Sequence, residues 1–450
     1  MRMAQVRQRR GDREPSPAPA APVAAAPEPR RPAGDWLSRL PSSIVLVVLV
    51  VVLLAMAVYV WFKIGHPPPK LLVVSLGGLR HDYLSRLPAE QLPFFTQLVR
   101  YGAHAEWLNP TFPSDGVATR ASLFTGVFPE KNGVFGPHVL DRELGELRLD
   151  GPAGHSAEDA AWWGGAVPFW NSAVRQWRRT AVAGLESACT PLDAFETTFC
   201  LPPFPAEKLA DTLTEILDRL LQPENPYGIG IVHTDALRRA AEEHGPTSEA
   251  LFDELRAIDR RLQQLDRQLT GRQARDSVNL VVVSDGGLTD TAQLQTVPVD
   301  ELLPAEAAVT LAGDGGAVLG YMATEHAQQA ARIAAEHPGV RAHLRGSLPA
   351  RLRLAHPQRE PDLLLVAEPG YYLENERPLA VQAAGGYDDT TGAAPDMRGV
   401  LLGRGPSFRA GATVQQANAV DVYPLLAALS HVIPEPHSGQ LSNVDGLLDW

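Results

Sequence analysis

Two hydrophobic patterns alternate along the chain from about residue 70 onward. Short apolar runs rich in β-branched residues predict buried strands, and they cover residues 71–76, 227–235, 278–285, 362–369 and 399–405. Segments with apolar residues at i, i+3, i+4 and i+7 predict amphipathic helices, and they cover residues 90–102, 206–222, 246–269 and 324–337. This alternation predicts an α/β fold with a mostly parallel central sheet covered by helices on both faces. A less regular insertion is expected around residues 300–385, within one domain that spans residues 70–450.

A different pattern precedes this domain. Residues 44–62 form an uncharged apolar run of 19 residues, about the length that crosses the hydrocarbon core of a bilayer. We therefore predict a transmembrane helix over residues 43–63, with a buried core helix as the alternative. Residues 1–42 are rich in Arg, Pro and Ala and are predicted to be a disordered tail.

Charge predicts the orientation of this membrane segment. The tail before it carries eight arginines and four acidic residues, so the positive-inside rule places the tail in the cytoplasm. The domain is then extracytoplasmic, which means periplasmic if the source is bacterial. The chain has no Asn-x-Ser/Thr glycosylation site, and this favours a bacterial periplasm over a secretory pathway. A net charge of −12 argues against nucleic acid as a partner.

The two cysteines, Cys189 and Cys200, lie in one short stretch. In an oxidising compartment they could close a loop by a disulfide bond. The sequence leaves this pairing and two free thiols as open alternatives.

The ends of the predicted strands are where chemistry is expected, because ligands of an open α/β sheet gather beyond the carboxyl ends of its strands. The first strand ends in Gly77 and Gly78, which offer no side chain. The stretch SDGVATRASLF is predicted to open a helix with Ser114 or Asp115 as N-cap. The N–H groups left free at that helix start would favour weak anion binding.

Several of these segments resemble the nucleotide pyrophosphatase/phosphodiesterase family of the alkaline phosphatase superfamily. They are SLGGLRHDYL (75–84), PTFPSDGVATRASLFTGVFPEKNGVFG (110–136), WWGGAVPFW (162–170), HGPTSEALFDELRAIDRRL (244–262), VVVSDGGL (281–288), GGYDD (385–389) and LLGRGPSF (401–408). The resemblance extends over residues 70–448 and implies an alkaline-phosphatase-like fold. It also fits membrane anchoring, which some members share.

The resemblance implies a centre of two zinc ions that activate a Thr or Ser nucleophile. The nucleophile position corresponds to Gly116, and TRASLFTG, which is similar to a sulfatase pattern, points to the same residue. Most metal ligands are also absent: Gly77 stands for an aspartate, and Gly286 and Gly385 stand for histidines. Asp235 and Asp285 keep the family's carboxylates. Arg238 and Arg239 replace a Gly-His pair.

The remaining polar residues allow several interpretations. Asp235 and Asp285 could cap turns or capture Mg²⁺ or Ca²⁺. Arg238 or Arg239 could supply positive charge in place of metal, or both could be solvated at a helix start. His233 and His244 could be recruited as zinc ligands, and Ser114 or Thr119 could be a displaced nucleophile. The recurring glycines suggest an enlarged cavity.

We therefore predict a membrane-anchored phosphodiesterase-like pseudoenzyme that needs no cofactor. Its role would be binding, either of a nucleotide-like or anionic ligand or of a protein partner whose identity the sequence does not indicate. A scaffold with a vestigial pocket is a further interpretation. The alternative is an active metal-dependent nucleotide pyrophosphatase/phosphodiesterase, a hydrolase that holds two zinc ions through recruited ligands.

Overall fold

The computed structural model describes residues 42–65, 69–149, 160–375 and 382–449. The chain divides into two compact units, Met1–Pro67 and Pro68–Trp450. The predicted disordered tail, residues 1–42, lies outside the described residues except for its last position.

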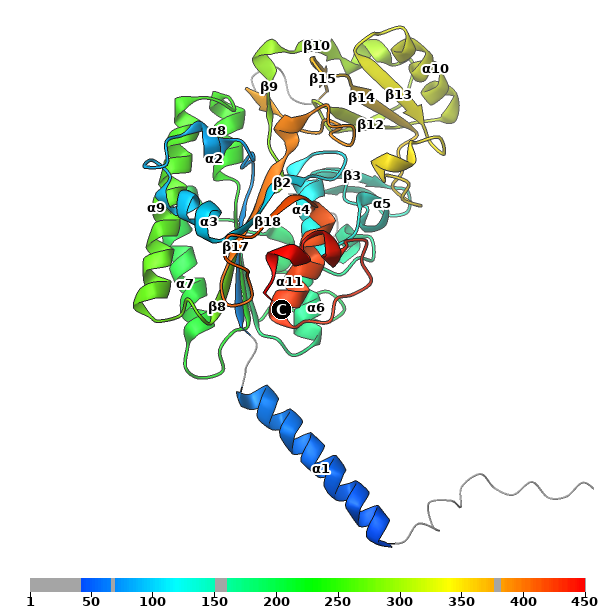
Figure 1. Ribbon diagram of the computed structural model, residues 1–450. Coiled ribbons are helices and arrows are strands. Elements are labelled where there is room, and N and C mark those ends of the chain that lie inside the picture. The colour runs from blue at the N-terminus through cyan, green and yellow to red at the C-terminus, as the bar shows by residue number, and fades with distance from the viewer. Residues whose placement is uncertain (1–41, 66–68, 150–159, 376–381, 450) are drawn as a thin grey trace, which may run out of the picture. The chain divides into compact units, whose positions relative to one another are not determined.

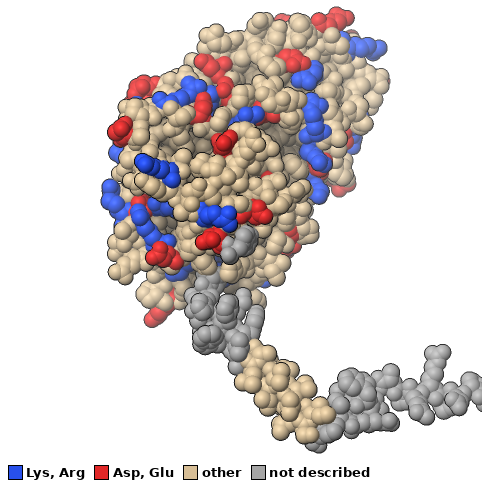
Figure 2. Space-filling view, in the orientation of Figure 1, with Lys and Arg blue, Asp and Glu red and all other residues tan. Residues whose placement is uncertain are grey.

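The predicted membrane segment over residues 43–63 falls on helix α1 (Ser42–Gly65), whose side chains are described for residues 43–56. This described part shows no charged side chain in Figure 2, and its large apolar residues are exposed. Within the described part of the chain, no helix combines the length and the apolar character needed to cross a membrane.

The larger unit is built on a central eight-stranded sheet (Figure 1), as the alternating patterns predict. The strand order is β18-β2-β17-β8-β1-β7-β5-β6. All neighbours pair in parallel except β17, which is antiparallel to both β2 and β8. In chain order the strands are β1 (Lys70–Leu76), β2 (Ala103–Asn109), β5 (Thr180–Ala183), β6 (Phe199–Leu201), β7 (Ile229–Thr234), β8 (Val278–Val283), β17 (Gly399–Arg404) and β18 (Thr413–Asn418).

Helices cover both faces of this sheet, because the strands are apolar on both sides. Alternate residues of β1 point to opposite faces. Leu72 and Val74 pack in the core cluster that includes α3 (Pro93–Tyr101), α7 (Leu209–Leu221) and α9 (Glu249–Gly271). Leu71 and Val73 pack in the cluster of α4 (Gly116–Thr125), α6 (Phe169–Arg175) and α11 (Val422–Ser430). Figure 1 shows these two groups of helices on either side of the sheet.

The expectation of a less regular insertion around residues 300–385 is wrong. This part forms a four-stranded antiparallel sheet of order β11-β12-β14-β13 (Figure 1). The apolar side chains of α10 (Thr324–Ala335) pack against it. The strands are β11 (Thr310–Ala312), β12 (Ala317–Tyr321), β13 (Val340–Leu344) and β14 (Leu363–Ala367). The strand predicted at residues 362–369 is β14, whereas β11 and β13 are partly exposed and β12 is short, so their apolar runs do not stand out in the sequence.

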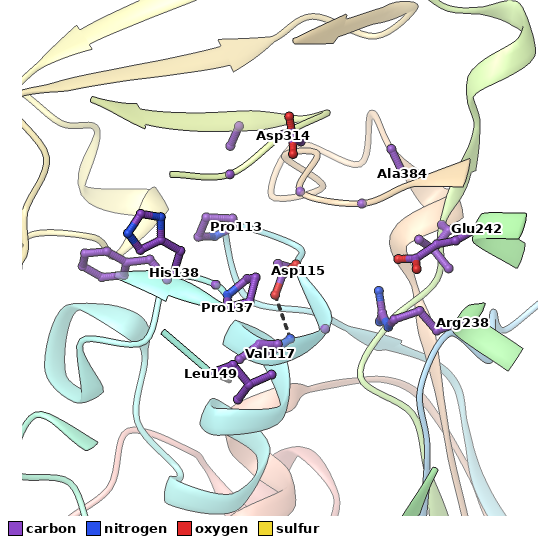
Figure 3. A pocket seen from close by; sticks show the side chains of 18 of the residues that line it. Pro113, Asp115, Val117, Pro137, His138, Leu149, Arg238, Glu242, Asp314 and Ala384 are labelled. Atoms are coloured by element: carbon purple, nitrogen blue, oxygen red, sulfur yellow. Dashed lines mark hydrogen bonds between the residues drawn. The ribbon is translucent and has the colours of Figure 1, made fainter. Parts of the chain in front are cut away.

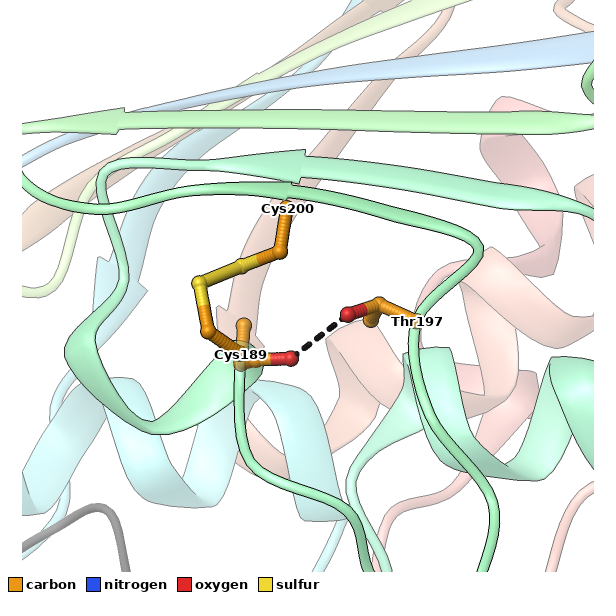
Figure 4. The surroundings of a disulfide bond; sticks show 4 residues. Cys189, Thr197 and Cys200 are labelled. Carbon is orange, nitrogen blue, oxygen red and sulfur yellow. Dashed lines mark hydrogen bonds between the residues drawn. A yellow bond between two sulfur atoms is a disulfide. The ribbon is translucent and has the colours of Figure 1, made fainter.

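Cys189 and Cys200 form a disulfide bond, which settles the alternative left open by the sequence. The bond ties the turn after a short 3-10 helix (Glu186–Ala188) to the edge strand β6. Thr197 donates a hydrogen bond to the carbonyl oxygen of Ala188 at 2.7 Å, across the same loop (Figure 4). The disulfide bond therefore fixes β6, the strand at one edge of the central sheet, to the loop that precedes it.

Candidate functional site

Three neighbouring strands, β8, β1 and β7, end at one point of the central sheet. β1 is followed by Gly77, β7 by Asp235 and β8 by Ser284 and Asp285. Because β1 pairs in parallel with both neighbours, the carboxyl ends of all three strands meet there. Helix α8 (Ala236–His244) begins directly after Asp235 and brings Arg238 to the same place.

Asp285 is fully buried and is surrounded by hydrogen-bond donors. One of its oxygens accepts from Arg120 Nη1 at 2.7 Å, and the other accepts from Arg238 Nη2 at 2.9 Å. The backbone N–H of Gly78 donates to the second oxygen at 3.1 Å. A buried carboxylate is costly unless charge and hydrogen bonds compensate it, and here two guanidinium groups do so.

Asp235 faces the same two arginines and a histidine. Arg120 Nη1 and Arg238 Nε each lie 3.6 Å from its Oδ1 atom, and His233 Nε2 lies 3.2 Å from Oδ2. The other ring nitrogen of His233, Nδ1, lies 3.0 Å from the hydroxyl of Ser75 on β1. Two carboxylates and two guanidinium groups thus form a compact, charge-balanced quartet with His233 at its side.

The pKa values in the quartet follow from these contacts. Burial acts to raise the pKa of Asp235, but His233, Arg120 and Arg238 together hold it well below its ordinary value. Burial acts to lower the pKa of Arg238, but Asp285 and Asp235 raise it above the ordinary value. Both groups are therefore charged at neutral pH.

The quartet fills the space beside two glycines, Gly116 at the expected nucleophile position and Gly77 at an expected ligand position. A Cβ atom on Gly116 would lie 2.5 Å from Cζ of Arg238, and one on Gly77 would collide with Oδ1 of Asp235. The expectation that the glycines enlarge the cavity is therefore wrong at these two positions. The missing side chains have left room that Arg238 and Asp235 now occupy.

Gly286 and Gly385 are also held close to backbone. A Cβ atom on Gly286, where φ is +114°, would lie 2.9 Å from the carbonyl oxygen of Met397. One on Gly385 would lie 2.9 Å from the carbonyl oxygen of Ser114. Neither position can carry a histidine unless the surrounding chain moves.

The start of α4 is capped by the protein itself. Asp115 is the N-cap, and its carboxylate accepts from the N–H groups of Val117 at 2.7 Å and Ala118 at 3.4 Å. The expectation of free N–H groups for an anion is therefore wrong for these two residues. An anion arriving there would also meet the negative charge of Asp115.

The other predicted contact residues take different places. Ser114 and Thr119 are buried: Ser114 donates to the carbonyl oxygen of Thr111, and Thr119 accepts from the Thr111 hydroxyl. Neither lines the cavity described next. His244 lies at the far end of α8 beside Glu243, whereas Arg239 is exposed at the cavity rim. The structure thus brings His233 and Arg238 to the two carboxylates and leaves the other four outside the quartet.

A cavity of about 310 Å³ opens above the quartet (Figure 3). Arg238 and Glu242 of α8 form one wall, His138 and Pro137 lie opposite, and Asp314 closes it from the second sheet. Four carboxylates and three guanidinium groups line it, namely Asp115, Asp235, Glu242, Asp314, Arg120, Arg238 and Arg239. Apolar side chains such as Phe135 and Leu149 complete the lining, which is therefore mixed, and its charged groups carry a slight acidic excess, unlike those of a site built for phosphate.

Arg120 is the site residue that sequence reasoning missed. In the sequence it only helped to locate the nucleophile position, which lies four residues before the arginine in the similar sulfatase pattern. Its spacing carried a usable signal, since residues four apart on a helix lie on one face and Arg120 follows Gly116 by four. A charged residue one turn after an emptied nucleophile position would be expected to point toward the same space.

Comparison with known proteins supports the resemblance. The sequence profile of the family described as type I phosphodiesterase / nucleotide pyrophosphatase matches residues 71–388. Human ectonucleotide pyrophosphatase/phosphodiesterase family member 5 is 24% identical over 409 residues, which cover 88% of this chain and 82% of that protein. The bis(5'-adenosyl)-triphosphatase enpp4 of Xenopus laevis is 23% identical over 383 residues, which cover 84% of this chain and 82% of that protein.

Solved structures agree with the sequence comparison. Murine ectonucleotide pyrophosphatase/phosphodiesterase 5, in an inactive form in complex with AMP, superimposes with a TM-score of 0.77 at 25% identity. The match covers 85% of this chain and 100% of that chain. The corresponding human structure superimposes with a TM-score of 0.76 at 24% identity and covers 85% of this chain.

Proposed function

Because this chain belongs to the type I phosphodiesterase / nucleotide pyrophosphatase family, we propose that it is a non-hydrolytic member whose remaining role is binding. One observation carries this proposal. The guanidinium of Arg238 is bound to Asp285, lies close to Asp235 and fills the space in front of Gly116. A fixed positive charge thus stands where the family's chemistry needs a metal and a nucleophile.

The residues present do not fit a centre of two zinc ions. In the described part of the chain, the one cluster of metal-ligating side chains is His233, Asp235 and Asp285. Both oxygens of Asp285 already accept from arginines, and two zinc ions need more donors than three side chains supply. We derive no catalytic step through zinc here.

A nucleophile is lacking as well. Gly116 has no hydroxyl, and the nearby hydroxyls of Ser114 and Thr119 are held in hydrogen bonds to Thr111, outside the cavity. Neither has a base beside it among the contacts that the structure describes, and an unactivated hydroxyl is a poor nucleophile.

The cavity supports binding of a nucleotide-like ligand held mainly through its nucleoside. Its volume and mixed lining, which includes Phe135 and Tyr372, suit a small polar molecule with an aromatic ring. The excess of carboxylates over guanidinium groups disfavours a phosphate dianion. We therefore expect adenosine to bind at least as tightly as AMP, the ligand present in the murine relative's structure.

We further propose that α1 anchors the domain to a membrane, with the domain on the extracytoplasmic side. The uncharged apolar run of residues 44–62 and the arginine-rich tail before it support this topology. The disulfide bond between Cys189 and Cys200 fits an oxidising compartment. The human relative is named an ectonucleotide pyrophosphatase/phosphodiesterase, which agrees with this location.

An active metal-dependent hydrolase is the second candidate. The observation that favours it is the cluster of His233, Asp235 and Asp285, whose ligand atoms lie within 4.8 Å of one another. This cluster could hold one cation if Arg238 moved away.

Metal content and turnover of the purified full-length protein separate the two candidates. We expect well below one zinc per chain after dialysis against trace zinc, and no hydrolysis of bis(p-nitrophenyl) phosphate above background. The matched variant Arg238→Ala should gain a zinc that the wild type lacks, because it frees one oxygen of Asp285 and removes one of the two guanidinium groups beside Asp235. Two zinc ions per wild-type chain together with turnover would overturn the proposal. Calorimetric titration with adenosine and AMP tests the binding role, and a protein that binds neither is a scaffold.

A further inference from the structure

One edge of the central sheet carries features that the cavity does not use. We call it the basal edge: it consists of the N-terminal ends of the parallel strands and the loops that lead into them. The strands start in register there, with Lys70 beside Val278 and both Leu71 and Thr180 beside Ile229. The cavity lies at the opposite ends of these strands, so this edge has no part in the binding site.

The chain enters the domain at the basal edge. Helix α1 ends at Gly65 and β1 begins at Lys70, five residues later. Five residues span at most about 17 Å, even when fully extended. The basal edge is therefore the part of the domain to which the proposed anchor is joined along the chain.

Trp177 at this edge has an unusual conformation. It follows α6 with φ of +62°, and its side chain is 95% exposed. The N–H of Trp177 donates to the carbonyl oxygen of Val174, and the N–H of Arg178 donates to the carbonyl oxygen of Ala173. Trp177 therefore occupies the helix-ending position that glycine usually takes. A bulky residue there is strained, and with its ring in solvent it gains no packing in the isolated domain.

Other exposed apolar residues accompany Trp177. Ile433 is 76% exposed and lies next to it, because its N–H and carbonyl both bond to the side chain of Gln176. Tyr101, which ends α3 just before β2, is 62% exposed. Trp and Tyr are the residues that concentrate where a bilayer meets water.

Positive charge surrounds these residues. Five basic side chains of the basal edge form no ion pair with any described residue, and they are Lys70, Arg100, Arg178, Arg179 and Arg409. Nε of Arg178 is buried without a hydrogen-bond partner. The acids on the loops that enter β6, β7 and β8 without an ion pair to a described residue are Glu196, Glu224 and Asp276. This local excess of positive charge contrasts with the net charge of −12 for the whole chain.

We infer that the basal edge is a contact surface for a bilayer with anionic headgroups. Trp177 and Ile433 enter the interface, and Arg178 and Arg179 pair with lipid phosphates. The inference rests on the anchoring proposed above but not on the proposed loss of hydrolysis. It explains both an exposed tryptophan in a conformation that suits glycine and an arginine that lacks an anionic partner.

Quenching of tryptophan fluorescence by brominated lipid tests the contact in full-length protein. The protein is reconstituted into vesicles of brominated phosphatidylcholine and phosphatidylglycerol, and wild type is compared with Trp177→Gly. With both tryptophans near the proposed anchor replaced in every protein compared (Trp36→Phe/Trp61→Phe), we expect a lipid-quenched component that disappears in Trp177→Gly, whereas Trp107→Phe, a control on β2, keeps it. Trp177→Gly should unfold at the same or a higher temperature, because glycine suits the position, so loss of the signal cannot be loss of the fold.

The arginines are tested on the same vesicles. The double variant Arg178→Glu/Arg179→Glu should weaken the Trp177-dependent quenching at least about fivefold, as should high salt, since each basic residue near an anionic surface contributes to binding. Equal lipid quenching in wild type and Trp177→Gly would overturn the inference. The inference would also be overturned if acrylamide failed to quench Trp177 while brominated lipid did not quench it either. In that case a second copy of the chain or another protein, and not the bilayer, would cover Trp177. Protein that fails to float with the vesicles would instead contradict the anchoring.

Discussion

The guanidinium carbon of Arg238 lies 2.5 Å from the point where a Cβ atom would be placed on Gly116. Glycine at position 116 and arginine at position 238 are therefore two parts of one arrangement, because neither an alanine nor a larger residue fits beside this guanidinium. The same guanidinium binds Asp285 at 2.9 Å. The space beside Gly116 and the charge balance of Asp285 thus depend on the same side chain.

Adding a methyl group at position 116 should cost stability through Arg238. We expect Gly116→Ala to lower the free energy of unfolding by about 1–3 kcal/mol, the usual cost of overfilling a packed site. Urea denaturation measures the change. The control Gly271→Ala also adds a methyl to a helix, in open space, and should gain about 0.5–1 kcal/mol. In a double-mutant cycle the penalty at position 116 should shrink when Arg238 is alanine, and equal penalties in both backgrounds would refute the clash.

Removing the charge of Arg238 should lower the free energy of unfolding, whereas removing the charge of its neighbour Arg239 should leave it nearly unchanged. Arg238→Met leaves the buried Asp285 with one guanidinium instead of two, and loss of one partner of a buried ion pair costs about 3–5 kcal/mol. Arg239→Met, one residue away but exposed, should stay within about 0.5 kcal/mol of wild type. Chemical denaturation at neutral pH compares the two variants, and similar losses would mean that the quartet does not stabilise the fold.

The quartet also predicts a dependence of stability on pH. The pKa of Asp235 is depressed in the folded protein, so its contribution is complete above the unfolded pKa of about 3.9 and is lost as pH falls further. Unfolding free energies measured at pH 7, 5, 4 and 3 should therefore drop more steeply below about pH 4 in wild type than in Asp235→Asn. Parallel curves would show that Asp235 is not held by its neighbours.

The disulfide bond should stabilise the domain measurably. It closes a loop with a sequence separation of 11 residues, for which chain entropy gives a stabilisation of about 3 kcal/mol. We expect the double variant Cys189→Ser/Cys200→Ser to unfold at lower temperature in calorimetry. Reductant should lower the unfolding temperature of the wild type to that of the double variant and leave the variant unchanged. A reductant effect on the variant would show that something other than this disulfide bond causes the change.

Much of the fold could be predicted from the sequence, since its buried strands are long and apolar. The strands expected at residues 71–76, 227–235, 278–285 and 399–405 are β1, β7, β8 and β17 of the central sheet. The edge strands β6 and β18 were not predicted, because they are partly exposed and lack a continuous apolar run. In the second sheet the strand expected at residues 362–369 is β14 and the helix expected at residues 324–337 is α10, whereas its other three strands were not predicted.

The site could be located from the sequence but not assembled. The end of the first predicted strand pointed to Gly77, and the family resemblance identified Asp235 and Asp285, each at the end of a further predicted strand. Hydrogen bonds between residues far apart in the chain carry no such signal, and Arg120 meets Asp285 across 165 positions. For the same reason the sequence could not distinguish Arg238, which binds Asp285, from Arg239, which faces solvent.

The interlocked packing at Gly116 and Gly77 has a consequence for the history of the molecule. A mutation that restored threonine at position 116 would meet Arg238, and one that restored aspartate at position 77 would meet Asp235. Replacing Arg238 first would leave Asp285 with Arg120 as its one charged partner. If the chain is the non-hydrolytic member proposed above, each single step back toward a hydrolase passes through a less stable protein, so that state behaves as a ratchet. Phosphodiester cleavage would then return only through several changes made together.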